Sequence, residues 1–144
     1  VLKITGYSND HMTVINQVQN AGESISCDVQ MPEPAYIHAG DDSGTPDFEL
    51  LRLCWKDYWT GDIEHKVTYY FKNSSGIQEL HRKHECDPGA TEDIPVARYI
   101  DFDIDDSDKT SCDYSGGIVT ITITASRNGT TETKVYEVLP RPGS

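Results

Sequence analysis

The chain has 144 residues, and its 24 acidic and 12 basic side chains give a formal net charge of −12 at pH 7. This balance excludes nucleic acid and anionic membrane surfaces as partners, because both reward clustered Lys and Arg. A basic partner fits better. No apolar run approaches the length of a transmembrane helix, and the length suits one domain. We therefore predict a single domain over residues 1–139 and a flexible tail over 140–144.

The N-terminal part of the chain is expected to contain four strands and one loop. Alternation of apolar and polar residues, bounded by Gly, Asn or Pro, predicts strands over Leu2 to Tyr7, His11 to Val18 and Ser24 to Gln30. Three prolines and two glycines make Met31 to Pro46 a long loop. Phe48 to Trp55 follows as a further strand.

The middle of the chain predicts a hairpin from Ile63 to Glu85, with Asn73-Ser74-Ser75-Gly76 at its tip. Centring this hairpin between Ser74 and Ser75 places His65 opposite His84. Glu85 to Pro95 is expected to be a loop. Tyr99 to Asp105 alternates apolar and acidic residues, which predicts a half-buried strand.

The strongest prediction is a last hairpin from Gly117 to Leu139. Its Asn128-Gly129 pair tolerates the positive φ angles of a type I′ turn. Folding the chain there places Val119 opposite Val138 and Ile121 opposite Tyr136, so that the apolar faces agree. The segments together predict an all-β domain, an antiparallel sandwich or barrel of about eight or nine strands.

Four cysteines, Cys27, Cys54, Cys86 and Cys112, predict two disulfide bonds. No C-x-x-C or C-x-x-H spacing occurs, which lowers the expectation of zinc or of a thioredoxin-like site. Three pairings are open; the strand order favours Cys27–Cys54 with Cys86–Cys112. Each closure would stabilise a small domain by about 3–4 kcal/mol, so reduction is expected to lower the melting temperature.

Two N-x-S/T sequons, at Asn73 and Asn128, fall at the predicted hairpin tips, where a glycan is sterically tolerated. Their placement and the even cysteine number predict a secreted, extracellular glycoprotein.

Histidines and acidic residues offer two candidate metal sites. His65 and His84 could take zinc with Cys86 or Glu64 nearby, but a cysteine in a disulfide is lost as a ligand, and His81 projects to the opposite face. The acidic run over residues 101–108 lacks the glycine and glutamate of a calcium loop. We therefore predict no metal and no cofactor.

The aromatic residues Trp55, Tyr58 and Trp59 form the candidate binding site. They suit a sugar platform or a protein interface, although a place over the core explains them as well. Catalytic motifs such as G-x-S-x-G, H-E-x-x-H and the P-loop do not occur in the sequence, which favours a binding protein over an enzyme.

The layout resembles two families. Asp106 precedes Cys112 by six positions, as in the F strand of immunoglobulin domains, but Thr110 replaces the expected tyrosine. The chain also resembles the fungal secreted family typified by the Alternaria major allergen. That resemblance is carried by residues 2–7 and 22–27, by Leu53-Cys54-Trp55, and by Cys112 with residues 118–125. The family implies an acidic secreted effector or allergen with two sequential disulfides.

We therefore expect a secreted, non-enzymatic, effector-like or allergen-like protein that binds a partner protein, for instance a host receptor or defence protein. An immunoglobulin-like ectodomain for adhesion and a carbohydrate-binding module are the alternatives.

Overall fold

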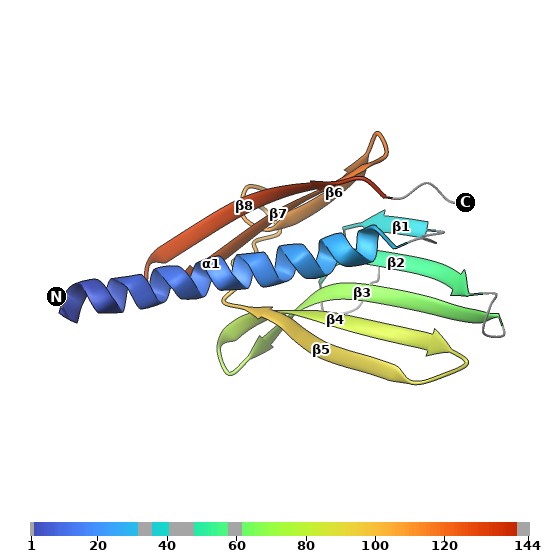
Figure 1. Cartoon of the computed structure of the whole chain (residues 1–144), viewed down its shortest axis with the longest axis horizontal. Helices are drawn as coiled ribbons and strands as arrows, with labels where there is room; N and C mark the ends of the chain where they lie inside the picture. Colours follow the sequence, from blue (N-terminus) through green and yellow to red (C-terminus); the bar gives the residue numbers. More distant parts are fainter. Residues whose placement is uncertain (1, 32–35, 41–47, 58–61, 141–144) are drawn as a thin grey trace.

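The computed structural model describes residues 2–31, 36–40, 48–57 and 62–140, with side chains from residue 9 onward. Most of this part of the chain is β-structure, as predicted, and one long helix precedes it (Figure 1). The elements are α1 (Leu2–Val29), β1 (Tyr36–Ala39), β2 (Glu49–Asp57), β3 (Ile63–Ser74), β4 (Ile77–Asp87), β5 (Thr91–Arg98), β6 (Ser111–Ser115), β7 (Ile118–Arg127) and β8 (Thr130–Val138).

The strands form two antiparallel sheets, a large one in the order β1-β2-β3-β4-β5 and a small one in the order β6-β7-β8. The sheets approach each other where β6 contacts β1 and β2, and α1 contacts β5, β7 and β8 on the other side (Figure 1). The barrel alternative is wrong, because the two sheets stay separate and α1 lies beside both of them.

Helix α1 replaces the three strands that were predicted before residue 31. Its buried residues Val14, Val18, Ala21, Ile25 and Val29 recur every three or four positions, which places them on one face of a helix. This face packs against the apolar residues of both sheets. The stripe is hard to find in the sequence, since one of its members is only an alanine and Ile15, outside the stripe, interrupts the pattern. No helix in the described part of the chain is long and apolar enough to span a membrane.

Both predicted hairpins are confirmed, because their turn residues act locally. The last hairpin has the expected register, with Val119 opposite Val138 and Ile121 opposite Tyr136. Asn128 and Gly129 have φ angles of 51° and 81°, as a type I′ turn requires. In the β3–β4 hairpin Ser74 pairs with Ile77, so its turn is centred one residue later than predicted.

The segment between the hairpins differs from the prediction. Residues Tyr99 to Asp105 do not form a strand. The buried Ile100 makes an isolated bridge to Ala125, and Asp103 makes another to Asp106. The edge strand β5 lies largely within the segment predicted as a loop. Pro95 lies in this strand, and edge strands are where a sheet tolerates proline. Strand β1 likewise lies in the predicted loop over Met31 to Pro46.

A buried polar cluster joins α1 to the large sheet. Asp28 accepts hydrogen bonds from Arg82 Nε at 2.7 Å and Nη2 at 3.0 Å, and it accepts another from the Tyr69 hydroxyl. Ser24 lies 2.8 Å from the same hydroxyl. Burial and the Asp28 carboxylate raise the pKa of Tyr69, so this hydroxyl keeps its proton and donates a hydrogen bond to Asp28. These bonds fix the end of α1 over β3 and β4.

The two predicted disulfides are wrong, since all four cysteines are free and no pair lies at disulfide distance. Cys27 is exposed on α1 and Cys112 belongs to the small sheet. Cys54 and Cys86 lie on opposite faces of the large sheet, by the alternation of their strands. The Cys27–Cys112 bond of an immunoglobulin-like domain is absent as well. Secretion therefore stays a prediction that rests on the two sequons.

Candidate functional site

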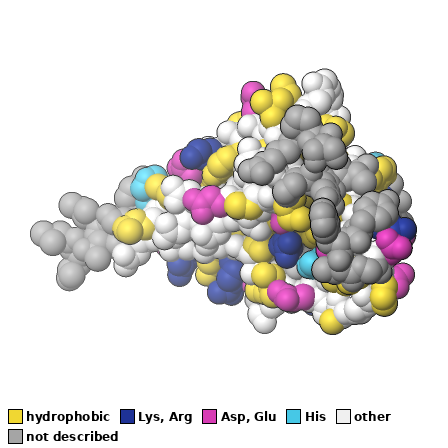
Figure 2. Space-filling model, turned by 45° about the vertical axis from the view of Figure 1, so that its right-hand side comes forward, with side chains coloured by type: hydrophobic (Ala, Val, Ile, Leu, Met, Phe, Trp, Pro, Cys, Tyr) yellow, Lys and Arg dark blue, Asp and Glu magenta, His cyan; other side chains and the backbone are white. Residues whose placement is uncertain are grey.

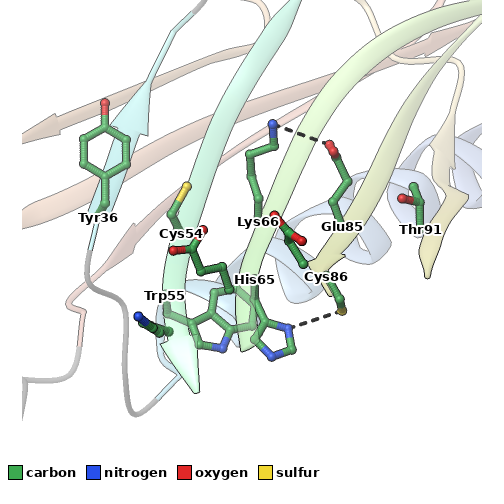
Figure 3. A pocket seen from close by; sticks show the side chains of 11 residues that line it. Tyr36, Cys54, Trp55, His65, Lys66, Glu85, Cys86 and Thr91 are labelled. Atoms are coloured by element: carbon green, nitrogen blue, oxygen red, sulfur yellow. Dashed lines mark hydrogen bonds and ion pairs between the residues drawn. The ribbon is translucent and has the colours of Figure 1, made fainter. Parts of the chain in front are cut away.

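The candidate site is a cleft of about 630 Å³ at the end of the large sheet where β2 ends and β3 begins. It wraps around this end of the sheet, so side chains of both faces line it (Figure 3). Tyr36, Cys54, Lys66 and Glu85 lie on one side of the strands in this view, and Trp55 lies on the other with His65 and Cys86. Concave sites of this size that combine aromatic and polar side chains are the usual places for ligands.

Strand pairing brings His65, His84 and Cys86 to the same face of the sheet. His65 lies opposite Cys86 and Val67 lies opposite His84. Residues 84 and 86 share a face because side chains alternate along a strand. The prediction placed His65 directly opposite His84, and the shift of the turn moves the partner by two residues. A shift of two keeps the face, so the two histidines still meet, and Cys86 joins them.

These three side chains are in direct contact. His65 Nδ1 lies 2.9 Å from His84 Nε2, and the Cys86 Sγ lies 3.5 Å and 3.6 Å from these two nitrogens. The ring of Trp55 stacks on His65, with centroids 4.8 Å apart and planes inclined by 3°, and it also stacks on His84 at 5.7 Å. The indole therefore holds both imidazole rings in one orientation.

The surroundings of this cluster favour the neutral form of one of its members, His84. Burial lowers the pKa of His84, and the nearby charges of Arg82 and His65 lower it further, so the imidazole is neutral at pH 7. On the other face of the sheet, burial raises the pKa of Cys54, which stays a thiol. Lys66 and Glu85 form an ion pair of 3.6 Å there. The charged pair Lys66–Glu85 thus lies on the face of the sheet opposite the stacked rings.

The other predicted site residues are scattered. Trp55 lines the cleft, whereas Tyr58 and Trp59 lie outside the described residues. Asn73 and Asn128 are exposed at the two hairpin tips, where the sequons predict glycans. His81 faces away from His65 and His84, as predicted, and lies 2.9 Å from Asp93 and 3.0 Å from Glu79.

The acidic run forms turns instead of the half-buried strand that was predicted. The Asp103 carboxylate accepts the Asp105 N–H at 3.0 Å, and the Asp106 carboxylate accepts the Asp108 N–H at 3.0 Å. Bonds of this kind define Asx turns, which explains the abundance of Asp in this segment without a cation.

Comparison with known proteins identifies no relative: no family model matches the chain, and neither the curated proteins nor the solved structures contain a match.

Proposed function

We propose that this is a non-enzymatic recognition protein that binds a partner protein at the cleft beside Trp55. The observation that carries the proposal is the arrangement of two aromatic side chains, Tyr36 and Trp55, among charged residues of both signs. Protein interfaces have this composition, with aromatic anchors at the centre and a polar rim. Tyr36 is 47% exposed, so its ring is accessible to a partner.

The charge of the whole chain indicates the kind of partner. A net charge of −12 favours encounter with a basic protein and repels an acidic one. On the face shown in Figure 2, acidic side chains lie among basic and apolar ones. Such mixing supports a partner that is recognised by shape and aromatic contacts and attracted by the overall charge. The acidic net charge and the two sequons support a secreted protein of the effector-like or allergen-like class.

The test compares Tyr36→Ala with Tyr114→Ala, because Tyr114 is similarly exposed, at 42%, but lies on the small sheet. Partners are captured by cross-linking to the wild-type protein, and each is then purified and its Kd measured at several salt concentrations. We expect Tyr36→Ala to weaken binding at least about tenfold, as loss of an interface anchor does. Tyr114→Ala should leave the Kd unchanged, and salt should weaken binding.

Equal Kd values for the two variants would contradict the proposal. Binding of a glycan array that depends on Trp55, without any protein partner, would instead favour the carbohydrate-binding alternative. One face of the Trp55 indole is covered by His65, which leaves only the other face for a sugar.

A second docking element is favoured by one observation on α1. The N-terminal end of the helix extends beyond both sheets (Figure 1). The residue of α1 nearest to this end with a described hydrogen bond to the sheets is Asp10, which lies 3.3 Å from Asn128. A helix end that projects from the sheets offers a partner protein an accessible surface. Met12→Glu tests it, since Met12 is 60% exposed: unchanged partner binding would exclude this end of α1 from the interface.

A further inference from the structure

The cleft contains two imidazoles and a thiol in direct contact, and this combination of side chains is typical of metal sites. The possible ligand atoms of three described residues, His65, His84 and Cys86, all lie within 4.8 Å of one another. These side chains are therefore a candidate metal-binding group. The three side chains come from two adjacent strands of a paired sheet, and Trp55 stacks on both rings. A binding site must be held in place before the ligand arrives, and these contacts hold it.

The dimensions of the cluster match those of a zinc site. Zn–N bonds of about 2.0–2.1 Å and a Zn–S bond of about 2.3 Å at tetrahedral angles place two nitrogens about 3.3 Å apart and nitrogen and sulfur about 3.5 Å apart. The observed distances are 2.9 Å between the nitrogens, and 3.5 Å and 3.6 Å from Sγ to each of them. A few tenths of an ångström of movement by the imidazoles would make the triangle fit the ion.

The chemistry of the three donors selects the class of metal. Imidazole and thiolate favour zinc and related transition metals, whereas Mg²⁺ and Ca²⁺ require oxygen ligands. We propose that His65, His84 and Cys86 bind one Zn²⁺ ion. On binding, the Cys86 thiol releases its proton to solvent as the Zn–S bond forms, and both histidines contribute neutral nitrogens. No oxidation or reduction accompanies this step.

Three protein ligands leave the fourth position of a tetrahedral ion for another donor. His65 and Cys86 line the cleft, so this position is accessible to water or to a donor atom from a bound partner. Zinc binding does not require the proposed partner, because water can take the fourth position and the binding is measured on the isolated protein. Cys86 would also be held as a ligand, which agrees with its free thiol.

The first test uses Co²⁺ as a coloured substitute for Zn²⁺ on the full chain, reduced and freed of metal. We expect one equivalent to bind and to give a thiolate-to-cobalt charge-transfer band together with the visible bands of tetrahedral cobalt. Zn²⁺ should abolish both, whereas an excess of Ca²⁺ or Mg²⁺ should not. The absence of a thiolate band in the wild-type protein, or the absence of saturable Zn²⁺ binding by calorimetry, would overturn the proposal.

The second test separates Cys86 from the other thiol that lines the cleft. Cys86→Ser should remove the charge-transfer band and weaken Zn²⁺ binding by more than the roughly 10–100-fold that loss of an outer-shell partner costs. The matched control is Cys54→Ser, since Cys54 lines the same cleft from the opposite face of the sheet. Its spectrum and affinity should equal those of the wild type.

Alkylation of the wild-type protein gives a readout that does not depend on a variant folding. Zn²⁺ should protect Cys86 from iodoacetamide, as peptide mass spectrometry can show, and should leave the exposed Cys27 reactive. Equal modification of Cys86 with and without Zn²⁺, or loss of zinc binding in Cys54→Ser rather than in Cys86→Ser, would contradict the assignment.

Discussion

Asp28 is the residue on which the junction between α1 and the large sheet depends. Its side chain is only 8% exposed and accepts hydrogen bonds from two nitrogens of Arg82, Nε and Nη2, and from the Tyr69 hydroxyl. The hydrogen bonds that Arg82 donates to Asp28 raise the pKa of Arg82, so the guanidinium is charged at every accessible pH. A buried carboxylate of this kind stabilises a fold only while its partners are present.

Replacement of Asp28 by Ala should therefore cost about 3 kcal/mol of the free energy of unfolding. This lies at the low end of the range for broken buried ion pairs, because Arg82 remains partly exposed and can regain some water. Urea denaturation measures the loss. The control is Lys109→Ala, which breaks the more exposed pair with Asp101 at 3.4 Å and should cost no more than about 1 kcal/mol. Equal losses in the two variants would contradict this role of Asp28.

Asp93 makes the stability depend on pH. Burial alone would raise its pKa, but hydrogen bonds from Tyr70 and His81 outweigh burial and hold the pKa below its ordinary value of 3.8, aided by Lys72. Because the folded state then binds fewer protons than the unfolded chain, its contribution to stability is complete above about pH 4. It is lost as the pH falls through the lowered pKa. Lys83 lies opposite Asp93 in the sheet and Glu79 lies against His81, so their charges act on the same group.

The variant Tyr70→Phe tests this dependence. It removes the hydroxyl that donates to Asp93, so its loss of stability relative to the wild type should be full at pH 5 and should shrink as the pH falls towards 2.5. Urea midpoints at several pH values measure the difference. A difference that stays constant over this pH range would show that the hydroxyl does not act through the Asp93 carboxylate.

At the scale of elements, α1 depends on tertiary contacts rather than on its own helix propensity. Its sequence is rich in Thr, Ser, Asn, Gly and Val, which are weak helix formers. Gly22 is buried where the helix approaches β8, and a Cβ atom there would lie 2.2 Å from the Tyr136 ring. An alanine at this position would therefore force the Tyr136 ring to move.

The double-mutant cycle of Gly22→Ala and Tyr136→Ala measures this close approach. In the wild-type background Gly22→Ala should destabilise the protein by about 1–3 kcal/mol, since the ring must move. In the Tyr136→Ala background the same change should stabilise it by up to about 1 kcal/mol, which is the gain in helix propensity. Effects of equal sign and size in the two backgrounds, measured by denaturation, would rule out the contact.

At the scale of the whole molecule, packing joins the two sheets and α1, and no disulfide bond links them. Residues of α1 and of both sheets belong to one buried apolar cluster. The Cys112 thiol agrees with the absence of disulfide bonds. Burial, together with the nearby Asp113 charge, raises the pKa of Cys112 to about 12. A thiol with such a pKa is protonated at neutral pH and is a poor nucleophile for disulfide exchange.

A strong reductant should therefore leave the melting temperature unchanged, contrary to the expectation from cysteine number. The measurement is a thermal scan with and without dithiothreitol in the presence of a chelator, so that no metal effect enters. Four thiols should also react with a thiol reagent in denaturant without prior reduction. A fall of several degrees with dithiothreitol, or fewer than four reactive thiols, would restore a disulfide to the structure.

The sequence by itself determined the two hairpins, because turn residues and alternating side chains act over a few positions. Asn128-Gly129 sets the last register, and Asn73 sets the other turn by accepting the Gly76 N–H at 3.0 Å. It also placed His65 and His84 on one face, since an error of two residues in register does not change the face.

Only the tertiary structure decided α1, the free state of the cysteines and the register that brings Cys86 against the two histidines. The stripe from Val14 to Val29 becomes a helix face because two sheets cover it, and isolated helices of weak formers are not stable in water. Cysteine number says nothing about distance, and the four thiols are separated by the faces and layers on which they lie. Cys86 lies directly opposite His65 because the turn is centred one residue later than the sequence predicts.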